Sequence, residues 1–77
     1  LYLLHWRGSA RIEETFEAFH RLRDTGKIGD FGVSNFDLDD MEDAADLDKG
    51  LTGTNQVLYC LSRRGPEFDL LPWMRKR

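Results

Sequence analysis

Hydrophobic residues follow two alternating kinds of spacing along this chain. Residues 1–5 form a short, almost continuous apolar run that ends in His5, and Gly8 follows soon after. A run of this length is typical of a strand that is buried on both faces. Beyond it, apolar side chains recur every three or four positions, which predicts an amphipathic helix that stops near Gly26. The residues at this spacing are Ile12, Thr15, Phe16, Phe19 and Leu22.

The same alternation repeats twice more. Residues 28–33 predict a second buried strand, and Asp37 is well placed to cap a second helix that begins at Leu38. Residues 55–61 predict a third strand, and residues 67–77 predict a third helix. The apolar stripes expected on these two helices consist of Leu38, Met41, Ala45 and Leu47 on the second, and of Leu70, Leu71 and Met74 on the third.

The predicted order of elements is therefore β-α-β-α-β-α. Buried strands that alternate with helices favour parallel pairing through right-handed crossovers. Units of this size are typical of an α/β fold, either a (β/α)8 barrel or a doubly wound sheet. No glycine-rich phosphate loop follows any of the strands, which counts against a dinucleotide site of the Rossmann type.

Composition narrows the range of partners. The 77 residues carry a net charge of −3, whereas a nucleic-acid footprint is normally basic. No apolar run approaches the roughly 20 residues of a membrane span, so we expect neither a nucleic-acid nor a membrane partner. Cys60 is the only cysteine, and the two histidines lack companion ligands at metal-site spacing. We therefore expect no disulfide and no metal, and a lone thiol suits a reducing, cytoplasmic setting.

Polar residues gather where the predicted strands begin or end. His5 ends the first strand, Ser34 and Asn35 follow the second, and Asn55 and Gln56 lie at the start of the third. In parallel α/β folds, chemistry is placed at the carboxyl ends of the strands. A neutral imidazole, a hydroxyl and carboxamides offer hydrogen-bond donors and acceptors without charge. Such a set can orient a carbonyl and hold an amide, but it contains no activated nucleophile and no paired carboxylates.

Three strand motifs, in order, resemble those of the aldo-keto reductase family. Residues 1–6 (LYLLHW) resemble the fourth strand of its barrel, residues 31–36 (FGVSNF) the fifth, and residues 55–59 (NQVLY) the sixth. Residues 67–73 (EFDLLPW) resemble the helix that follows. The resemblance covers essentially the whole chain and implies a partial (β/α)8 barrel with three consecutive β/α units. Residues 1–77 would then be a piece of a single barrel domain.

The resemblance also implies roles for particular residues. His5 would hydrogen-bond the substrate carbonyl oxygen, and Trp6 would line the substrate pocket. The carboxamide of a nicotinamide dinucleotide, usually NADP(H) and otherwise NAD(H), would be held by Ser34, Asn35 and Gln56. The family's general acid is a tyrosine supported by an aspartate and a lysine, all from earlier strands, so this chain lacks them.

The sequence therefore predicts part of an NAD(P)H-dependent oxidoreductase that reduces aldehydes or ketones, with the rest of the barrel as a necessary partner. The 77 residues alone are expected to be inactive. Two alternatives stay open: a non-catalytic, cofactor-binding regulatory subunit of the same fold, and a truncated product without function.

Each candidate residue also has a purely structural interpretation. His5 would be a core histidine, Ser34 and Asn35 would cap the next helix, and Gln56 would edge a strand. Cys60 is expected to be a buried, inert thiol. The seven acids between positions 37 and 48 are expected to form a solvated helix face.

Overall fold

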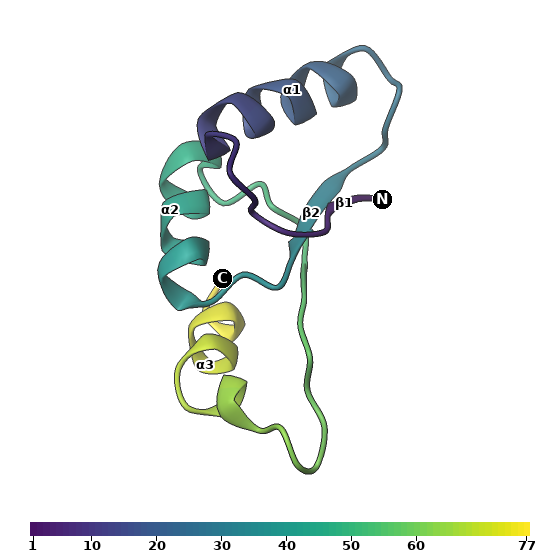
Figure 1. Ribbon diagram of the computed structural model, residues 1–77. Coiled ribbons are helices and arrows are strands. Elements are labelled where there is room, and N and C mark those ends of the chain that lie inside the picture. Colours follow the sequence, from purple (N-terminus) through teal and green to yellow (C-terminus); the bar gives the residue numbers. More distant parts are fainter.

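The computed structural model describes residues 1–77 and shows three β/α units in sequence (Figure 1). The elements are β1 (Tyr2–Leu4), α1 (Ile12–Asp24), β2 (Phe31–Ser34), α2 (Leu38–Asp48), β3 (Asn55–Gln56), a short 3₁₀ turn (Gly65–Glu67) and α3 (Leu70–Arg75). This order agrees with the β-α-β-α-β-α pattern of the sequence.

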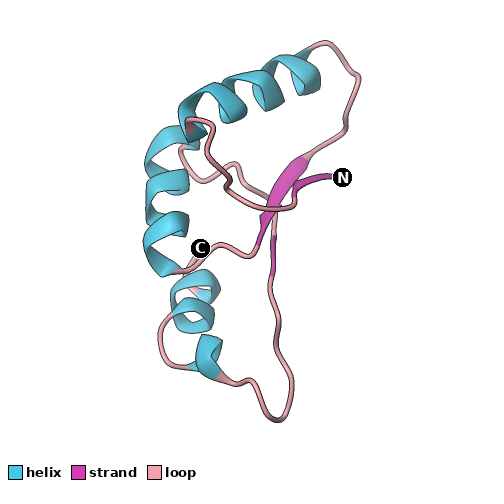
Figure 2. Ribbon diagram, viewed as in Figure 1, coloured by secondary structure: helices cyan, strands magenta, loops and turns pink.

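The three strands form one parallel sheet with β2 in the centre. Leu4 of β1 lies opposite Val33, and Val33 in turn lies opposite Asn55 of β3. The helices lie on one side of this sheet, as the ribbon coloured by secondary structure also shows (Figure 2). All three strands therefore present their carboxyl ends to the same edge.

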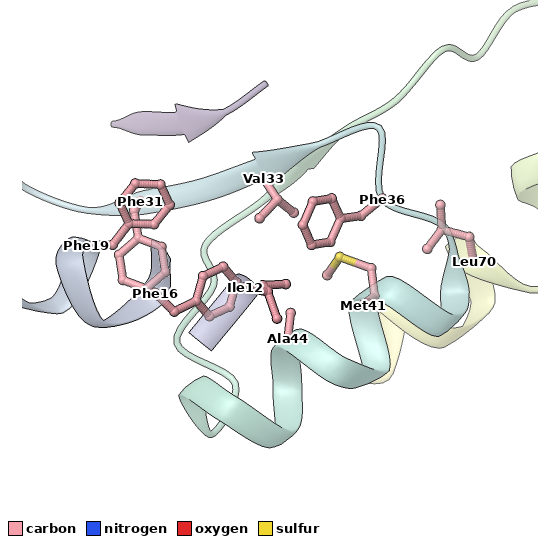
Figure 3. Packing of buried hydrophobic residues seen from close by; sticks show 9 residues of the cluster. All are labelled: Ile12, Phe16, Phe19, Phe31, Val33, Phe36, Met41, Ala44 and Leu70. Atoms are coloured by element: carbon pink, nitrogen blue, oxygen red, sulfur yellow. The ribbon is translucent and has the colours of Figure 1, made fainter. Parts of the chain in front are cut away.

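The core fills the layer between the sheet and the helices (Figure 3). Phe31 and Val33 of β2 have no exposed surface, and they point toward α1 and α2. The other members of the cluster are Ile12, Phe16, Phe19, Phe36, Met41, Ala44 and Leu70. Aromatic rings dominate its α1 end, where Phe19 lies 5.2 Å from Phe31 between ring centroids. Burial of such rings is the main favourable term for this layer.

Local signals define the ends of the first two helices. Gly26, at φ 75°, follows the C-cap of α1, a left-handed conformation that glycine adopts without strain. Asp37 caps α2: its carboxylate accepts from the backbone N–H of Asp40, and the carboxylate of Asp40 accepts from the N–H of Asp37. This reciprocal capping box confirms the predicted start of α2 at Leu38.

The strands differ from the prediction in burial and length. β1 is not buried on both faces, because Leu1 and Tyr2 are largely exposed at the outer edge of the sheet. β2 begins only at Phe31 rather than at residue 28. β3 spans two residues instead of seven, and Leu58 and Leu61 beyond it are exposed. An outer strand extends only as far as its one neighbour offers hydrogen-bonding groups, and apolar content alone does not reveal that length.

The helices also differ from the prediction. On α2, Ala44 and Asp48 are buried in place of Ala45 and Leu47. Asp48 leaves the expected solvated face because its carboxylate accepts from the N–H of Gly50 and from the hydroxyl of Thr52. The third helix is shorter than residues 67–77, since a 3₁₀ turn precedes it.

Cys60 is exposed rather than buried, because it lies in the irregular segment after β3. A hydrogen bond with Ser62 lowers the pKa of its thiol below the ordinary value. The longest helix, α1, has 13 residues, and none of the helices could span a membrane.

Candidate active site

Hydrogen bonds join four of the five polar residues that were predicted at the strand ends. The side-chain amide of Asn35 donates to the backbone oxygen of His5 at 2.9 Å and to Oγ of Ser34 at 3.2 Å. The Ser34 hydroxyl donates to the backbone oxygen of Gln56 at 2.8 Å. The chain of contacts therefore crosses all three strands, and it brings together residues that lie up to 51 positions apart in the sequence.

Asn35 is the centre of this arrangement. Its φ is 60°, a left-handed conformation that asparagine tolerates better than most residues. In this conformation its backbone N–H donates to the oxygen of Gln56 at 2.9 Å while its side chain reaches His5 on the other side. One residue thus fixes the ends of β1 and β3 relative to β2.

Several polar groups at this edge stay available to a ligand. The side chains of His5 and Gln56 are exposed and form no hydrogen bond within the chain, and Oδ1 of Asn35 accepts none. The imidazole of His5 stacks on Trp6, with ring centroids 5.9 Å apart. A carboxamide ligand needs both donors and acceptors, and the amides of Asn35 and Gln56 offer them. The donor set therefore fits the amide of a nicotinamide ring.

Ser34 is less free, because it is 5% exposed and its hydroxyl hydrogen is committed to Gln56. It can still accept a hydrogen bond, and it holds the amide of Asn35 in place. It does not cap the next helix, as its structural interpretation expected, because Asp37 does so.

A pocket of about 390 Å³ opens beside this edge. Trp6 forms one wall, and Asp37 and Leu38 at the start of α2 form another. Of the predicted site residues, Trp6 and Asn35 line the pocket, whereas His5, Ser34 and Gln56 lie outside its lining. Trp6 is 61% exposed, so it is a surface that a ligand can cover rather than a core residue.

Asn55 has a role that the sequence did not reveal. It is buried, and its carboxamide forms two hydrogen bonds with the backbone of Phe36. Oδ1 accepts from the N–H at 3.3 Å, and Nδ2 donates to the oxygen at 2.8 Å. The turn after β2 is thereby fixed immediately beyond Asn35. A carboxamide at the start of a buried strand was the available signal, because such a group must find partners.

Arg7 is a second residue that the sequence did not single out. Its guanidinium donates to Asp40 at 2.5 Å and to Asp43 at 3.0 Å. Burial disfavours the charged form of Asp40, but the hydrogen bonds from Arg7 and from the backbone of Asp37 outweigh it, so the pKa of Asp40 is lowered. Hydrogen bonds to Asp40 and Asp43 raise the pKa of Arg7. The pair is therefore ionised at neutral pH.

The sequence profile of the Aldo/keto reductase family matches residues 1–77, the whole chain. The chain belongs to this family. Its fold matches that of a solved member of the family, so the predicted partial (β/α)8 barrel is confirmed.

Two curated relatives illustrate the similarity. The chain is 51% identical over 78 residues to methylglyoxal reductase YeaE of Escherichia coli (strain K12), an alignment that covers 100% of this chain and 28% of that protein. It is 37% identical over 76 residues to aldo-keto reductase YhdN of Bacillus subtilis (strain 168), covering 97% of this chain and 22% of that protein. The chain thus spans about a quarter of the length of its relatives.

A solved structure agrees closely in fold. The crystal structure of an aldo/keto reductase from Klebsiella pneumoniae in complex with NADP and acetate matches with a TM-score of 0.92 and 50% identity. The match covers 97% of this chain and 27% of that protein. A second structure of an aldo-keto reductase from the same organism, in complex with NADPH, matches equally well.

Proposed function

We propose that residues 1–77 are the central β/α units, the fourth to the sixth, of a single barrel domain that reduces aldehydes or ketones with NADP(H). The observation that carries this proposal is the hydrogen-bonded chain from His5 through Asn35 and Ser34 to Gln56. It brings His5, which would bind the substrate carbonyl, to the same edge of the sheet as the residues that would bind the nicotinamide carboxamide. The relatives' names and bound molecules support the same chemistry.

The cofactor half of the site consists of Asn35 and Gln56, with Ser34 behind them. Their carboxamides would hold the nicotinamide carboxamide and so fix which face of the ring is presented. NADPH, when bound, supplies the hydride. Holding the donor in one orientation next to the carbonyl accounts for much of the rate that such a site can provide.

The substrate half consists of His5 and Trp6. The imidazole of His5 would donate a hydrogen bond to the carbonyl oxygen, where negative charge develops as the hydride arrives. Trp6 would cover the carbon skeleton of the substrate. Trp6 lines a pocket of about 390 Å³ next to His5, which lies outside its lining. A 2-oxoaldehyde such as methylglyoxal, which the name of one relative specifies, is the first candidate substrate.

The remaining chemistry would come from the rest of the barrel. Neither tyrosine of the chain lies at the strand-end cluster: Tyr2 packs edge-on against Phe19, and Tyr59 hydrogen-bonds Glu67. The general acid tyrosine, with its aspartate and lysine, would therefore be supplied by strands outside residues 1–77. A reducing, cytoplasmic setting is also part of the proposal, since Cys60 is a free thiol.

The test begins with the intact mass of the protein from its native source. A complete barrel of about 250 residues or more has a mass of several tens of kilodaltons. A mass near 9.0 kDa would contradict the proposal. The complete protein is then assayed for methylglyoxal-dependent oxidation of NADPH, together with His5→Ala and the control His20→Ala.

We expect His5→Ala to lower kcat by about 10²-fold or more, the usual effect of losing one donor to a developing oxyanion. His20 lies on α1 with its ring edge toward Phe31, so its replacement should leave kcat unchanged. NADPH binding without any carbonyl turnover would instead favour the regulatory-subunit alternative. Full activity in His5→Ala would refute the role of this histidine.

A further inference from the structure

The loop between β1 and α1 has few attachments to the rest of the fold. His5 is tied to β2 by the amide of Asn35. Among residues 6–10, only Arg7 forms hydrogen bonds with the rest of the chain. Trp6 lies between these two attachments and is largely exposed. Trp6 stacks on His5 and forms no hydrogen bond of its own, so Arg7 is the nearest polar attachment on its other side.

Asp40, the partner of Arg7, is itself rigidly placed. One carboxylate oxygen accepts from Arg7, while the other accepts from the backbone N–H of Asp37 in the capping box of α2. The N–H of Asp40 donates back to Asp37 at 2.9 Å. Because the capping box holds this carboxylate in place, the ion pair ties Arg7, and the loop that carries it, to the start of α2. Asp43, one helical turn later, holds the same guanidinium nitrogen at 3.0 Å.

Neither Arg7 nor Asp40 lines the pocket, but each lies next to one of its walls in the chain. Trp6 forms one wall, and the first turn of α2, with Asp37 and Leu38, forms the other. Arg7 follows Trp6 directly, and Asp40 belongs to that first turn. The Arg7–Asp40 contact therefore links the residue after Trp6 to the first turn of α2.

We propose that Arg7 is a positioning residue for substrate binding: through Asp40 it sets where Trp6 lies against the first turn of α2, without touching substrate or cofactor. The inference rests on the proposed function of this pocket as the carbonyl site. Hydrogen bonds between β2 and β3 hold the backbones of Asn35 and Gln56, and Arg7 takes no part in them. We therefore expect the affinity for the cofactor not to change when Arg7 is replaced.

The first test compares Arg7→Met with Arg11→Met in the complete protein. Both substitutions remove one positive charge from the same loop, but Arg11 is 74% exposed at its side chain and pairs only loosely with Glu13, at 3.7 Å. For Arg7→Met we expect the KM for methylglyoxal to rise about two- to fivefold, the range that part-exposed ion pairs contribute. The dissociation constant of NADPH, measured by fluorescence quenching, should not change. Arg11→Met should match the wild type in both quantities.

A second test perturbs the ion pair in the wild type itself by adding salt. Methylglyoxal is uncharged, so with saturating NADPH any effect of salt on kcat/KM reports on the protein. Salt screens a part-exposed pair, with a Debye length near 3 Å at about 1 M. The wild type should lose kcat/KM as KCl is raised to about 1 M, whereas Arg7→Met should be flat across the same range. Arg7→Lys retains the charge and should recover part of the loss.

The outcomes separate the two proposals. If the wild type reduces carbonyls but its KM is insensitive both to salt and to Arg7→Met, the inference is wrong and the proposed function stands. A parallel rise in the NADPH dissociation constant would show a general disturbance of the fold, which also overturns it. If the wild type has no carbonyl-dependent turnover, the proposed function fails and this inference fails with it.

Discussion

Asn55 and Asn35 show how one residue type serves two purposes within one sheet edge. Asn35 is half-buried, and part of its carboxamide faces the solvent. Asn55 is 8% exposed, and both its amide oxygen and its amide nitrogen form hydrogen bonds with the backbone of Phe36. Both lie at strand termini in the sequence, so the motif alone does not distinguish them. The difference arises because residues 36 and 55 become neighbours only when the sheet forms.

The structural role of Asn55 leads to a prediction for the complete protein. In Asn55→Leu, the N–H and the oxygen of Phe36 lose their buried partners, and each unsatisfied group costs about 1–3 kcal/mol. We therefore expect the free energy of unfolding, measured in urea, to fall by at least about 1 kcal/mol. Gln56→Leu is the control, because that neighbouring side chain is exposed and unbonded. Equal stabilities for the two variants would contradict the role assigned to Asn55.

At the scale of elements, the contact between β2 and β3 depends on the absence of a side chain at Gly32. A Cβ there would lie 2.7 Å from the carbonyl oxygen of Thr54 and 3.0 Å from Leu3. The same oxygen accepts from the N–H of Val33 at 2.9 Å, so it cannot move without opening the sheet. The short distance between the two strands at this point therefore requires a glycine.

Gly32→Ala should consequently destabilise the complete protein by about 1–3 kcal/mol, as overpacking of a tight site usually does. It should also lower reductase activity, because Ser34 and Gln56 lie on the strands that are forced apart. Gly29→Ala is the matched control, since a Cβ at that position meets nothing within 4 Å. Thermal unfolding and the NADPH assay measure both effects, and indistinguishable melting curves for the two variants would count against the argument.

The N-terminus of α2 gives a prediction about pH. The pKa of Asp40 is lowered from its ordinary value of 3.8, so folding favours the ionised form. Its contribution to stability is therefore complete above about pH 4 and is lost as the pH falls through the lowered value. Since the pair is partly exposed, we expect at most about 1 kcal/mol.

The measurement is the unfolding free energy of wild type and Asp40→Asn from neutral pH down to about pH 2, within the range where carboxylates titrate. The difference between the two proteins should be largest at neutral pH and should vanish at the acid end. Asp39→Asn is the control, because Asp39 is exposed and pairs with nothing. A difference that stays constant with pH would mean that Asp40 does not act through its charge.

These elements also show what the sequence could and could not predict. The capping by Asp37 and the stop at Gly26 were predicted because both depend on a few adjacent residues. The length of β3 was not, since it depends on which groups of β2 face it. The burial of Asp48 was missed for a similar reason: the N–H of Gly50 and the hydroxyl of Thr52 can donate to its carboxylate only after the turn has formed. The strand-end cluster was predicted as a set, but the contacts of Asn55 and Arg7 were not.

At the scale of the whole molecule, the chain buries little of itself. Only 13 of the 77 residues are buried, and large apolar side chains remain exposed, among them Leu61 at 96% and Phe68 at 88%. β1 and β3 also leave their outer edges unpaired. Small domains bury only about 60% of their unfolded surface and are marginal even when well packed, and open strand edges invite association. These surfaces are what a complete barrel would cover.

The last prediction contrasts the isolated chain with the same chain inside a barrel. The 77 residues alone should self-associate. They should also show no methylglyoxal-dependent oxidation of NADPH, because a site without a proton donor lacks the rate enhancement of roughly 10²–10⁴-fold that general acid catalysis provides. Placed in E. coli YeaE in exchange for the matching segment, to which they are 51% identical, they should restore a soluble, active reductase.

In that chimera, His5→Ala should abolish the activity while His20→Ala retains it. Activity in the isolated chain that disappears with His5→Ala would show that the 77 residues suffice, and that the rest of the barrel is dispensable. A folded chimera that binds NADPH but reduces no carbonyl would locate the failure in the substrate half, at His5 and Trp6, because the amide ligands would then be intact.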